Sequence, residues 1–426
     1  MKKNHFPRKI IPFGIFFLVV TASSRAENLF SFTGYSKNFS ILFRMPGYKL
    51  QEQTVSKPDL GAVNNRLRIM VDFFPSQRVS FHLAYGLSAR IQDPLLFDDG
   101  VYFGLLNLPE YRFDDLHDRL YPQPGESISS FGLFHNLDRF YVTFETDFAD
   151  LFIGRQPIAW GSARFINPTD IIAPFAFNEL DREDSLGVDA VRLRIPLGKM
   201  DELDLGFVAG ENFKSDNSAF FLRGRIYKFQ TDISALLLGF RNHLLIGLDV
   251  TRAIGGAGFW FESAYVIPGF FREKKEPKEN NYFRASIGAD YNLNSKTYGF
   301  IEYHLSSAGK NQPEKYLDLL QSSAFRDGSV YLLGRHYLNI GTIYQLNPLL
   351  PFTGMIILNL SDLSLVLSPS FEYNIAENIY LAAGAYIGLG KKPKLSIDLL
   401  NPLPFFYRSE FGTYPDMVYT SFRIYF

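Results

Sequence analysis

The sequence predicts an all-β protein, an antiparallel transmembrane β-barrel of about 18 strands, with about 16 as the other possible count. Three observations predict it. Hydrophobic residues make up 46% of the chain and aromatic residues 16%, enough to exclude an intrinsically disordered protein. Outside the N-terminus, no apolar run approaches the roughly 20 residues of a membrane-spanning helix. Instead, segments of about 10 residues alternate apolar and polar side chains, and turn residues separate them.

The first 26 residues have the pattern of a secretory signal peptide. Basic residues near Lys2 and Lys9 precede an apolar stretch from Ile10 to Val20, and small residues follow at Ser24 and Ala26. This stretch is too short to span a membrane as a helix. We therefore expect cleavage after Ala26, leaving residues 27–426 as a single barrel domain.

The alternation assigns the two faces of each strand. In the segment 282–292, Phe283 and Ile287 lie on one face, and Arg284 and Asp290 lie on the other. An apolar face of this kind is expected to meet lipid, and the polar face is expected to line a wet lumen. On this register, five side chains are expected on the lipid side: Leu67, Phe81, Phe283, Ile340 and Leu381.

The strand prediction covers most of the chain after residue 29, and the first strand is its least certain element. The predicted strands are 30–44, 63–74, 78–90, 137–148, 150–160, 187–196, 203–210, 218–229, 231–240, 243–252, 257–267, 282–292, 297–305, 335–346, 352–360, 363–373, 378–389 and 417–426. Short links alternate with long ones, except for two short outer links near 241–242 and 361–362. This alternation predicts short periplasmic turns and long extracellular loops. The long links are 45–62, 91–136, 161–186, 268–281, 306–334 and 390–416.

The last predicted strand ends on an aromatic residue. Phe422, Ile424 and Phe426 share one face of it. An alternating strand that ends in phenylalanine resembles the assembly signal of Gram-negative outer-membrane barrel proteins, including porins. The resemblance implies a location in the outer membrane, contact with its lipid and lipopolysaccharide, and delivery by the barrel-assembly machinery. An ordinary terminal strand of a soluble sheet is the alternative.

Arginine dominates the charged residues on the predicted lumen face, where lysine is almost absent. The planar guanidinium group binds carboxylates and phosphates through two parallel hydrogen bonds, which a lysine does not. This favours a lumen that prefers anions. In the alternative interpretation, the arginines pair with acidic residues of neighbouring strands and brace the wall. The predicted pore-lining residues are Arg66, Arg68, Arg78, Arg192, Arg194, Arg223, Arg225 and Arg284, and the same register places Arg44 on this face.

The outer link 161–186 resembles in position the third extracellular loop of porins, which folds inward and narrows the pore. Its acidic residues Asp181, Glu183 and Asp184 would then face the arginines of the wall. The alternative is a surface loop in which Asn167, Thr169 and Asp170 form a turn and a helix cap. The stretch around it is also similar to segments of uncharacterised outer-membrane barrel families, and this likeness implies no substrate.

Patterns of catalytic and metal sites are missing from the sequence. It has no G-x-S-x-G, H-E-x-x-H, P-loop or G-x-G-x-x-G motif, no cysteine, and no histidine at metal-ligand spacing from another. We therefore expect no enzyme, no cofactor, no metal and no nucleic-acid partner. The leading hypothesis is an outer-membrane channel for small, anionic solutes. The alternatives are an export pore for an anionic polysaccharide and a blocked barrel that acts as an adhesin or structural protein.

The terminal strand makes a testable prediction. Deletion of Phe426 is expected to impair assembly, because the resemblance assigns recognition by the assembly machinery to this residue. The measurement is the heat-modifiable gel mobility of the protein in the outer-membrane fraction. A deletion variant that assembles as efficiently as the parent would contradict the assignment.

Overall fold

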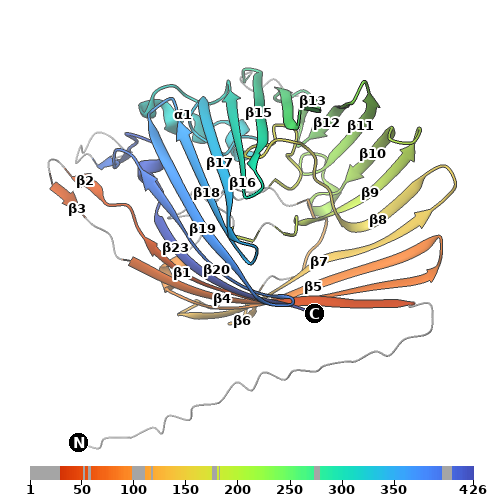
Figure 1. Cartoon of the computed structure of the whole chain (residues 1–426), viewed down its shortest axis with the longest axis horizontal. Helices are drawn as coiled ribbons and strands as arrows, with labels where there is room; N and C mark the ends of the chain where they lie inside the picture. Colours follow the sequence, from red (N-terminus) through yellow and green to blue (C-terminus); the bar gives the residue numbers. More distant parts are fainter. Residues whose placement is uncertain are drawn as a thin grey trace, which may run out of the picture.

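The computed structural model describes residues 29–50, 53–55, 59–97, 111–116, 119–174, 180–181, 183–272, 279–395 and 405–426. The predicted signal peptide, residues 1–26, lies outside this set. In the described part, 18 long strands form one antiparallel sheet (Figure 1). They are β1 (Phe30–Arg44), β4 (Asp59–Ser76), β5 (Val79–Gln92), β7 (Phe131–Glu145), β8 (Asp150–Pro157), β9 (Gly187–Pro196), β10 (Glu202–Val208), β11 (Ala219–Lys228), β12 (Thr231–Phe240), β13 (His243–Ile254), β14 (Ala257–Ile267), β15 (Tyr282–Asn294), β16 (Thr297–Ser306), β17 (His336–Asn347), β18 (Leu350–Asn359), β19 (Ser364–Ala376), β20 (Ile379–Leu389) and β23 (Asp416–Tyr425).

The sheet closes into a barrel because β1 pairs on both of its edges. Its partners are β4, the next wall strand, and β23, the last one, and both pairings are antiparallel. Beyond the end of β23, the Gly34 amide donates to the Phe426 carbonyl at 2.8 Å and the Phe426 amide donates back at 2.9 Å. The predicted all-β barrel of about 18 strands is therefore confirmed, including its least certain first strand.

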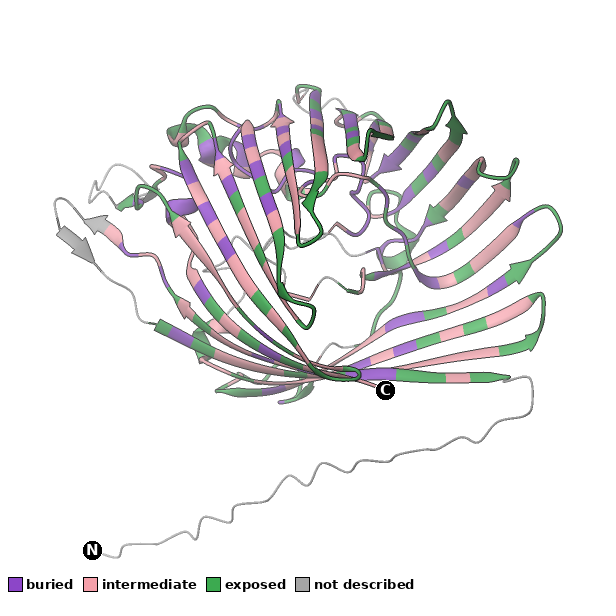
Figure 2. Cartoon of the chain, in the orientation of Figure 1, coloured by how far each residue is buried: buried purple, intermediate pink, exposed green. Residues whose placement is uncertain are grey.

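Side chains alternate between the two faces of the wall, and Figure 2 shows the resulting stripes of burial along the strands. The five residues expected on the lipid side, from Leu67 to Leu381, are each 37% to 44% exposed. Large apolar side chains left open on one continuous face are what a lipid-exposed wall requires. The register predicted from the sequence therefore agrees with the structure at these five positions.

Strand β7 begins at Phe131, six residues before the predicted start at 137. Its pairing with β5 is continuous from Phe131, but the register shifts where Ala84 and Tyr85 face Arg139 and Leu137. Asp138 is the extra residue in this bulge. An extra residue reverses the order of inward and outward side chains, which hides the alternation on which the sequence prediction depends.

Two-residue turns join several neighbouring strands. Phe229 and Gln230, between β11 and β12, both have positive φ angles, as do Arg241 and Asn242 between β12 and β13. Positive φ at both central residues is the type I′ geometry, whose twist matches that of an antiparallel hairpin. The turn at 241–242 lies at the end of the barrel that carries the long loops. No long loop extends beyond the strand ends at this point.

The long loops carry the remaining elements. Short strands β2 (Tyr48–Leu50), β3 (Gln53–Val55), β21 (Lys394–Leu395) and β22 (Phe405–Phe406) form a second small sheet, and β6 (Arg119–Tyr121) pairs with β7. The helices are α1 (Tyr316–Leu320) and α2 (Ser323–Arg326), with 3-10 turns at Pro94–Leu96, Glu211–Phe213, Pro313–Lys315 and Phe411–Thr413. Within the described ranges, none of these helices is long and apolar enough to cross a membrane.

A packed apolar cluster occupies part of the barrel near the long loops. It joins wall residues to residues of several links, among them α1, α2 and the link between β8 and β9. Its members include Phe221, Leu238, Val266, Tyr316, Leu319, Ile158, Trp160, Ile171 and Ile172. Apolar side chains that face inward here are therefore covered by loops rather than by water, which narrows the space left inside the barrel.

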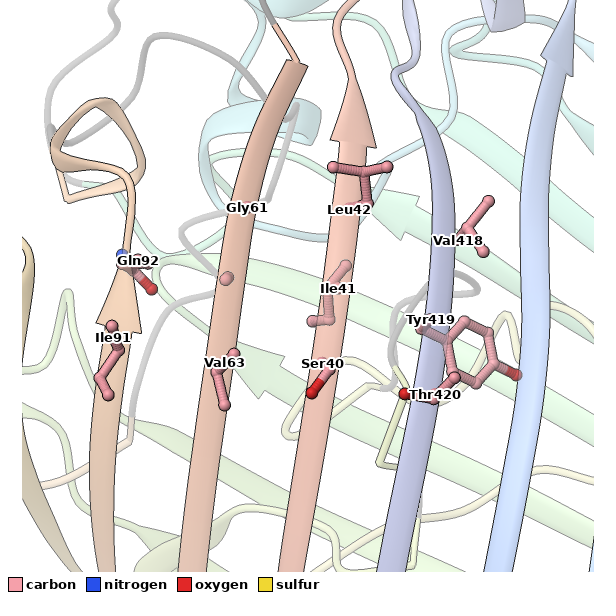
Figure 3. Close-up of a pocket in the computed structure, with 11 residues that line it drawn as sticks. Ser40, Ile41, Leu42, Gly61, Val63, Ile91, Gln92, Val418, Tyr419 and Thr420 are labelled. Atoms are coloured by element: carbon pink, nitrogen blue, oxygen red, sulfur yellow. The ribbon is translucent and has the colours of Figure 1, made fainter.

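The outer face at the closing seam has a shallow hollow of about 520 Å³ (Figure 3). Its residues come from four adjacent strands, β23, β1, β4 and β5, and Leu42, Gly61 and Val418 are among them. A Cβ added at Gly61 would meet no atom within 4 Å, so the missing side chain leaves open space between its larger neighbours.

The two faces predict different tolerance to charge. Leu248 is 38% exposed in the middle of β13, and Thr251 on the same strand faces inward beside its cross-strand partner Asp232. We expect Leu248→Arg to lower the free energy of unfolding by about 2–4 kcal/mol, because it places a cation in hydrocarbon. Thr251→Arg is the matched control and is expected to cost far less. Equilibrium unfolding in lipid vesicles measures both, and equal penalties would contradict the assignment of faces.

Candidate functional site

The described parts of the link between β8 and β9, residues 158–174, 180–181 and 183–186, lie inside the barrel; we call them the inner loop. Residues 162–169 hydrogen-bond to β13, β14 and β16, and residues 181–185 contact β1, β4, β7 and β23. These two sets of strands lie far apart around the closed sheet. The two described parts of the inner loop therefore contact well-separated regions of the inner wall.

Two wall carboxylates hold the first half of the inner loop by its backbone. Glu262 on β14 accepts hydrogen bonds from the amides of Ser162 and Ala163, both at 3.1 Å, and from the amide and hydroxyl of Thr169 at 2.8 and 2.7 Å. Both side-chain oxygens of Glu262 are therefore occupied by the loop. Hydrogen bonds from amides to a carboxylate are charge-assisted and stronger than neutral ones.

Glu302 on β16 repeats this arrangement for the next residues. It accepts from the amides of Arg164, Phe165 and Ile166 at 2.6, 3.2 and 3.3 Å, and from the indole nitrogen of Trp260 at 2.9 Å. Amides of consecutive residues 162–166 thus end on two carboxylates. We call this set, with Glu262 and Glu302, the carboxylate anchor.

Further polar groups surround the carboxylate anchor. The Arg164 guanidinium lies 2.9 Å from the Asp290 carboxylate, and the Ser286 hydroxyl donates to the Ile166 carbonyl at 2.7 Å. Asp170, in the inner loop itself, is buried. Burial and, to a smaller extent, the negative charge of Glu262 together raise the pKa of Asp170 to about 8. The predicted turn residues Asn167, Thr169 and Asp170 therefore lie inside the barrel rather than in a surface loop.

The second half of the inner loop is held by cations of the wall. Lys37 on β1 is fully buried, and its ammonium lies 2.7 Å from both Asp181 and Glu183. The same ammonium sits 3.9 Å from the ring centre of Tyr35, a distance at which the ring quadrupole attracts a cation. Lysine was predicted to be almost absent from this face, and the sequence prediction missed Lys37 as a partner of the loop.

Three arginines complete this second set of contacts, which we call the cation anchor together with Lys37. Arg66 lies 3.1 Å from Asp181, Arg68 lies 3.1 Å from Asp184, and Arg423 lies 3.0 Å from Glu183. Burial alone would raise the pKa of Glu183, but hydrogen bonds from Lys37 and Tyr425 outweigh it and hold the pKa below its usual value. This carboxylate therefore stays ionised, and its pairing persists, to a lower pH than usual.

A second group of arginines lies on β9 and β11. Arg192 pairs with Asp204 through two hydrogen bonds of 2.8 and 2.6 Å, and Arg194 pairs with Glu202 at 2.6 Å. The Nε of Arg225 donates to the Asp232 carboxylate at 2.9 Å. Each of these pairs joins neighbouring strands, as the wall-bracing interpretation expects.

Arg223 is bound less tightly than the other three. It donates to the Ser234 hydroxyl at 2.8 Å, and its nearest carboxylate in an ion pair is Glu202 at 3.9 Å. The side chains of Arg194 and Arg225 are the most open of the group, at 38% and 40% exposed. Pairing with carboxylates and access from the lumen therefore coexist on this part of the wall.

The predicted pore-lining arginines that lie on inward faces are of two kinds, partly open and buried. Arg66, Arg192, Arg194, Arg223 and Arg225 lie on inward faces and keep part of their surface. Arg68 and Arg284 are only 2% exposed; Arg68 is enclosed by Asp138 and Asp184, and Arg284 lies beneath the inner loop near the Pro168 carbonyl.

Arg78 and Arg44 lie outside the inner wall. Arg78 sits in the turn before β5, beside Asp147 of another turn at 3.0 Å. Arg44 pairs with Asp59 on the outward register of β1 and β4. The run of apolar residues Ile41, Leu42 and Phe43 before Arg44 conceals the inward or outward direction of this strand end, so its placement in the lumen was wrong.

The residues of the predicted assembly signal lie at the closing seam. Phe422 and Phe426 are exposed on the outer face, Ile424 is half-buried, and the Phe426 ring stacks on Phe32 with centroids 6.2 Å apart. Their role in recognition by the assembly machinery stays a prediction. Across the described ranges, no group of three or more His, Asp or Glu side chains is placed to hold a metal ion.

Solved structures from two bacteria, among others, have a similar fold. Acinetobacter baumannii OccAB1 matches with a TM-score of 0.54 and 11% identity, covering 92% of this chain and 96% of its own. Pseudomonas aeruginosa OccD3 (OpdP) matches at 0.53 and 10%, covering 93% and 91%. The outer membrane protein OprD from Pseudomonas aeruginosa matches at 0.52 and 11%, covering 92% and 93%.

No protein-family model and no curated protein matches this sequence. At about a tenth identical residues, the likeness to the solved structures concerns the fold. A closed barrel of 18 strands with an apolar outer face is the architecture of an outer-membrane protein. The chain is a porin-like β-barrel of the outer membrane.

The carboxylate anchor makes a testable prediction. Glu302→Gln replaces two carboxylate oxygens by a single amide oxygen. Three backbone amides and an indole now donate to those two oxygens, so some buried donors lose their hydrogen-bond partner in the variant. Each lost partner is expected to lower the free energy of unfolding by about 1–3 kcal/mol. We expect faster amide hydrogen exchange at Arg164, Phe165 and Ile166. Glu372→Gln, which removes the carboxylate beside Arg423 and contacts no residue of 164–166, is the matched control. Unchanged exchange at 164–166 in the Glu302 variant would show that the anchor does not hold the loop.

Proposed function

We propose that the protein is an outer-membrane channel for small solutes and that it prefers anionic ones. The observation that carries the proposal is the inner loop, whose described parts lie inside the barrel, together with a wall that presents partly open arginines. A loop fixed to both walls narrows a barrel without sealing the wall around it, and a narrowed lumen lined by charge is how outer-membrane barrels select solutes.

The preference for anions rests on the arginines of β9 and β11. Arg194 and Arg225 keep about two fifths of their side-chain surface open although each is paired with a carboxylate. A guanidinium has five N–H groups, so one carboxylate partner leaves donors available to a passing anion. Arg223 donates to the neutral Ser234 hydroxyl rather than to a close carboxylate, and its side chain is 16% exposed.

The packing inside the barrel supports small solutes over the export of a polysaccharide. The inner loop and the apolar cluster around Trp160 and Tyr316 together occupy much of the barrel near the long loops. Export of a polysaccharide chain requires a continuous open lumen. The residues of the inner loop and of the apolar cluster are instead fixed inside the barrel by buried contacts. The blocked barrel stays as the competing function, and conductance separates it from a channel.

Planar-bilayer recording tests the proposal. We expect discrete conductance steps, and a reversal potential under a salt gradient that reports preference for anions. The double variant Arg194→Gln/Arg225→Gln is expected to lower this preference, because it removes two cations and leaves Glu202 and Asp232 without them. Each single variant is expected to give a smaller change in the same direction.

Arg78→Gln is the matched control, since it removes one exposed arginine and its ion pair from a turn at the barrel end. Its selectivity is expected to equal that of the parent. A parent pore that prefers cations, or a double variant with unchanged selectivity, would overturn the anion preference. A folded barrel that never conducts would overturn the channel itself and favour the blocked barrel.

A further inference from the structure

A hollow of about 370 Å³ lies on the outer face of the wall over β7 to β10. Its lower part consists of outward side chains on four adjacent strands, and the register pairs Ile153 with Val191 and Val191 with Phe207. Each is well exposed, and Phe140 on β7, at 62%, is the most open. These side chains belong to the face that meets hydrocarbon.

The wall is unusually short at this place. Strand β8 has 8 residues and β10 has 7, whereas a tilted strand needs about 9–11 to cross the bilayer. Two loop segments continue the wall above them. The Tyr111 carbonyl accepts from the Asp189 amide at 2.9 Å, and the Phe113 carbonyl accepts from the Asn212 amide at 2.9 Å.

These two segments form an apolar roof over the hollow. The rings of Phe113 and Phe213 stack with their centres 4.9 Å apart, and both rings line the hollow. They are 44% and 61% exposed, so the roof itself presents apolar surface that nothing in the described chain covers. By contrast, the hollow at the closing seam is lined by strand residues alone and has no roof (Figure 3).

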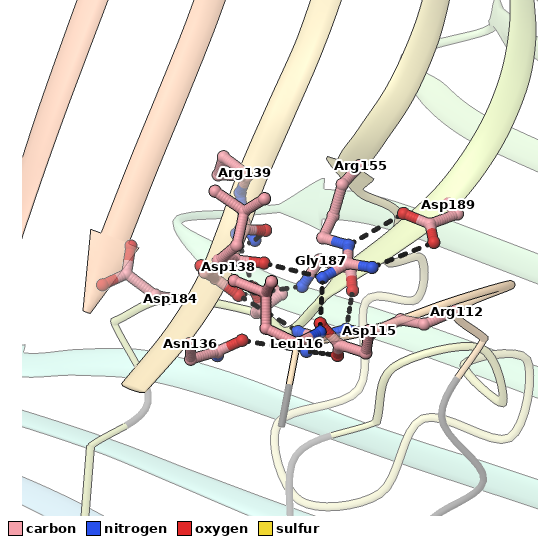
Figure 4. A network of polar contacts seen from close by, with 12 residues as sticks. Arg112, Asp115, Leu116, Asn136, Asp138, Arg139, Arg155, Asp184, Gly187 and Asp189 are labelled. Atoms are coloured by element: carbon pink, nitrogen blue, oxygen red, sulfur yellow. Dashed lines mark hydrogen bonds and ion pairs between the residues drawn. The ribbon is translucent and has the colours of Figure 1, made fainter. Parts of the chain in front are cut away.

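A chain of ion pairs closes the back of the hollow (Figure 4). Arg155 shares the outward direction of Ile153, yet it is buried, because Asp189, Asp115 and the carbonyls of Leu137 and Asp114 surround its guanidinium. With these partners, all three of its nitrogen atoms are hydrogen-bonded. Arg155 therefore seals the wall and offers no free charge to a ligand.

The seal continues to the inner face of the barrel. Arg112 bonds to the Gly187 carbonyl at 3.0 Å and to the Asn136 side chain at 2.8 Å, and it lies 3.8 Å from Asp138. Asp138 in turn pairs with Arg68, which faces the lumen, at 2.7 Å. An apolar occupant therefore has access to the hollow from the lipid and not from the lumen.

The bottom of the hollow depends on a glycine. Gly154 has a φ of +118°, and a Cβ placed there would lie 2.3 Å from the Phe140 carbonyl. No other residue type fits this conformation and this close approach. The glycine therefore allows the backbone of β7 to approach β8 closely at the bottom of the hollow.

We propose that this hollow is a binding site for one acyl chain of an outer-leaflet lipid. The site is apolar on its wall and roof, is closed toward the lumen, and opens on the face that lies in hydrocarbon near the end with the long loops. A lipid chain is the apolar molecule present at that face, and ordering it there covers Phe113 and Phe213. The proposal depends on the barrel fold and not on solute passage.

Native mass spectrometry of the full-length barrel in detergent, with lipid A, the acylated part of lipopolysaccharide, added as the probe, tests the proposal. We expect one lipid to be retained by the parent protein. Val191→Trp fills the hollow, and Phe113→Ala/Phe213→Ala removes its roof. Each is expected to lower lipid retention at least tenfold. Heat-modifiable gel mobility establishes that each variant has folded.

Phe270→Ala/Phe271→Ala is the matched control, since it removes another exposed and contacting aromatic pair, with ring centres 4.9 Å apart, from a different loop. This control is expected to retain the lipid as the parent does. Equal retention by all variants, or no retained lipid in the parent, would overturn the proposal. A dimer that disappears in the two hollow variants would assign the surface to a second copy of the chain instead.

Discussion

The structure depends on one constraint: every backbone amide and carbonyl that lies in hydrocarbon needs a partner within the protein. An open sheet edge at bilayer depth would leave a row of unpaired groups, each costing several kcal/mol. Strand β1 removes both edges because it pairs with β4 on one side and β23 on the other. Once the sheet is closed, each side chain has only two directions, toward lipid or toward the lumen, and everything functional follows from that division.

The inner loop is fixed by anchors of opposite chemistry. On one wall, Glu262 and Glu302 accept backbone amides; on the other, Lys37 and its neighbouring arginines bind the carboxylates of the loop. Hydrogen bonds to charged groups contribute about 1.5–3 kcal/mol each. Exposed ion pairs such as Arg78 with Asp147 contribute about 0–1 kcal/mol. The buried anchors, and not the ion pairs at the rim, therefore determine where the loop lies.

The alternation of side chains was enough to predict the barrel, its strand count and the lipid-facing residues, because a period of two directly reports which face is apolar. The bulge at Asp138 and the apolar run before Arg44 interrupt that period, and there the prediction failed. The burial of Arg68, Arg284 and Lys37 could not be predicted from the sequence, for a different reason. It depends on the path of the inner loop, which brings residues from distant strands together, and no local pattern records such a contact.

The contacts of the inner loop with strands far away in the sequence have a consequence for the order of barrel assembly. The inner loop leaves the wall in the middle of the chain, yet its carboxylates bind Lys37 on the first strand and Arg423 on the last. These two cations stand next to each other, as Lys37 faces Arg423 across the seam, and they become neighbours only when the seam forms. The ion pairs of Glu183 with both Lys37 and Arg423 therefore stabilise only the closed barrel, and a partly assembled sheet is not stabilised by the complete set.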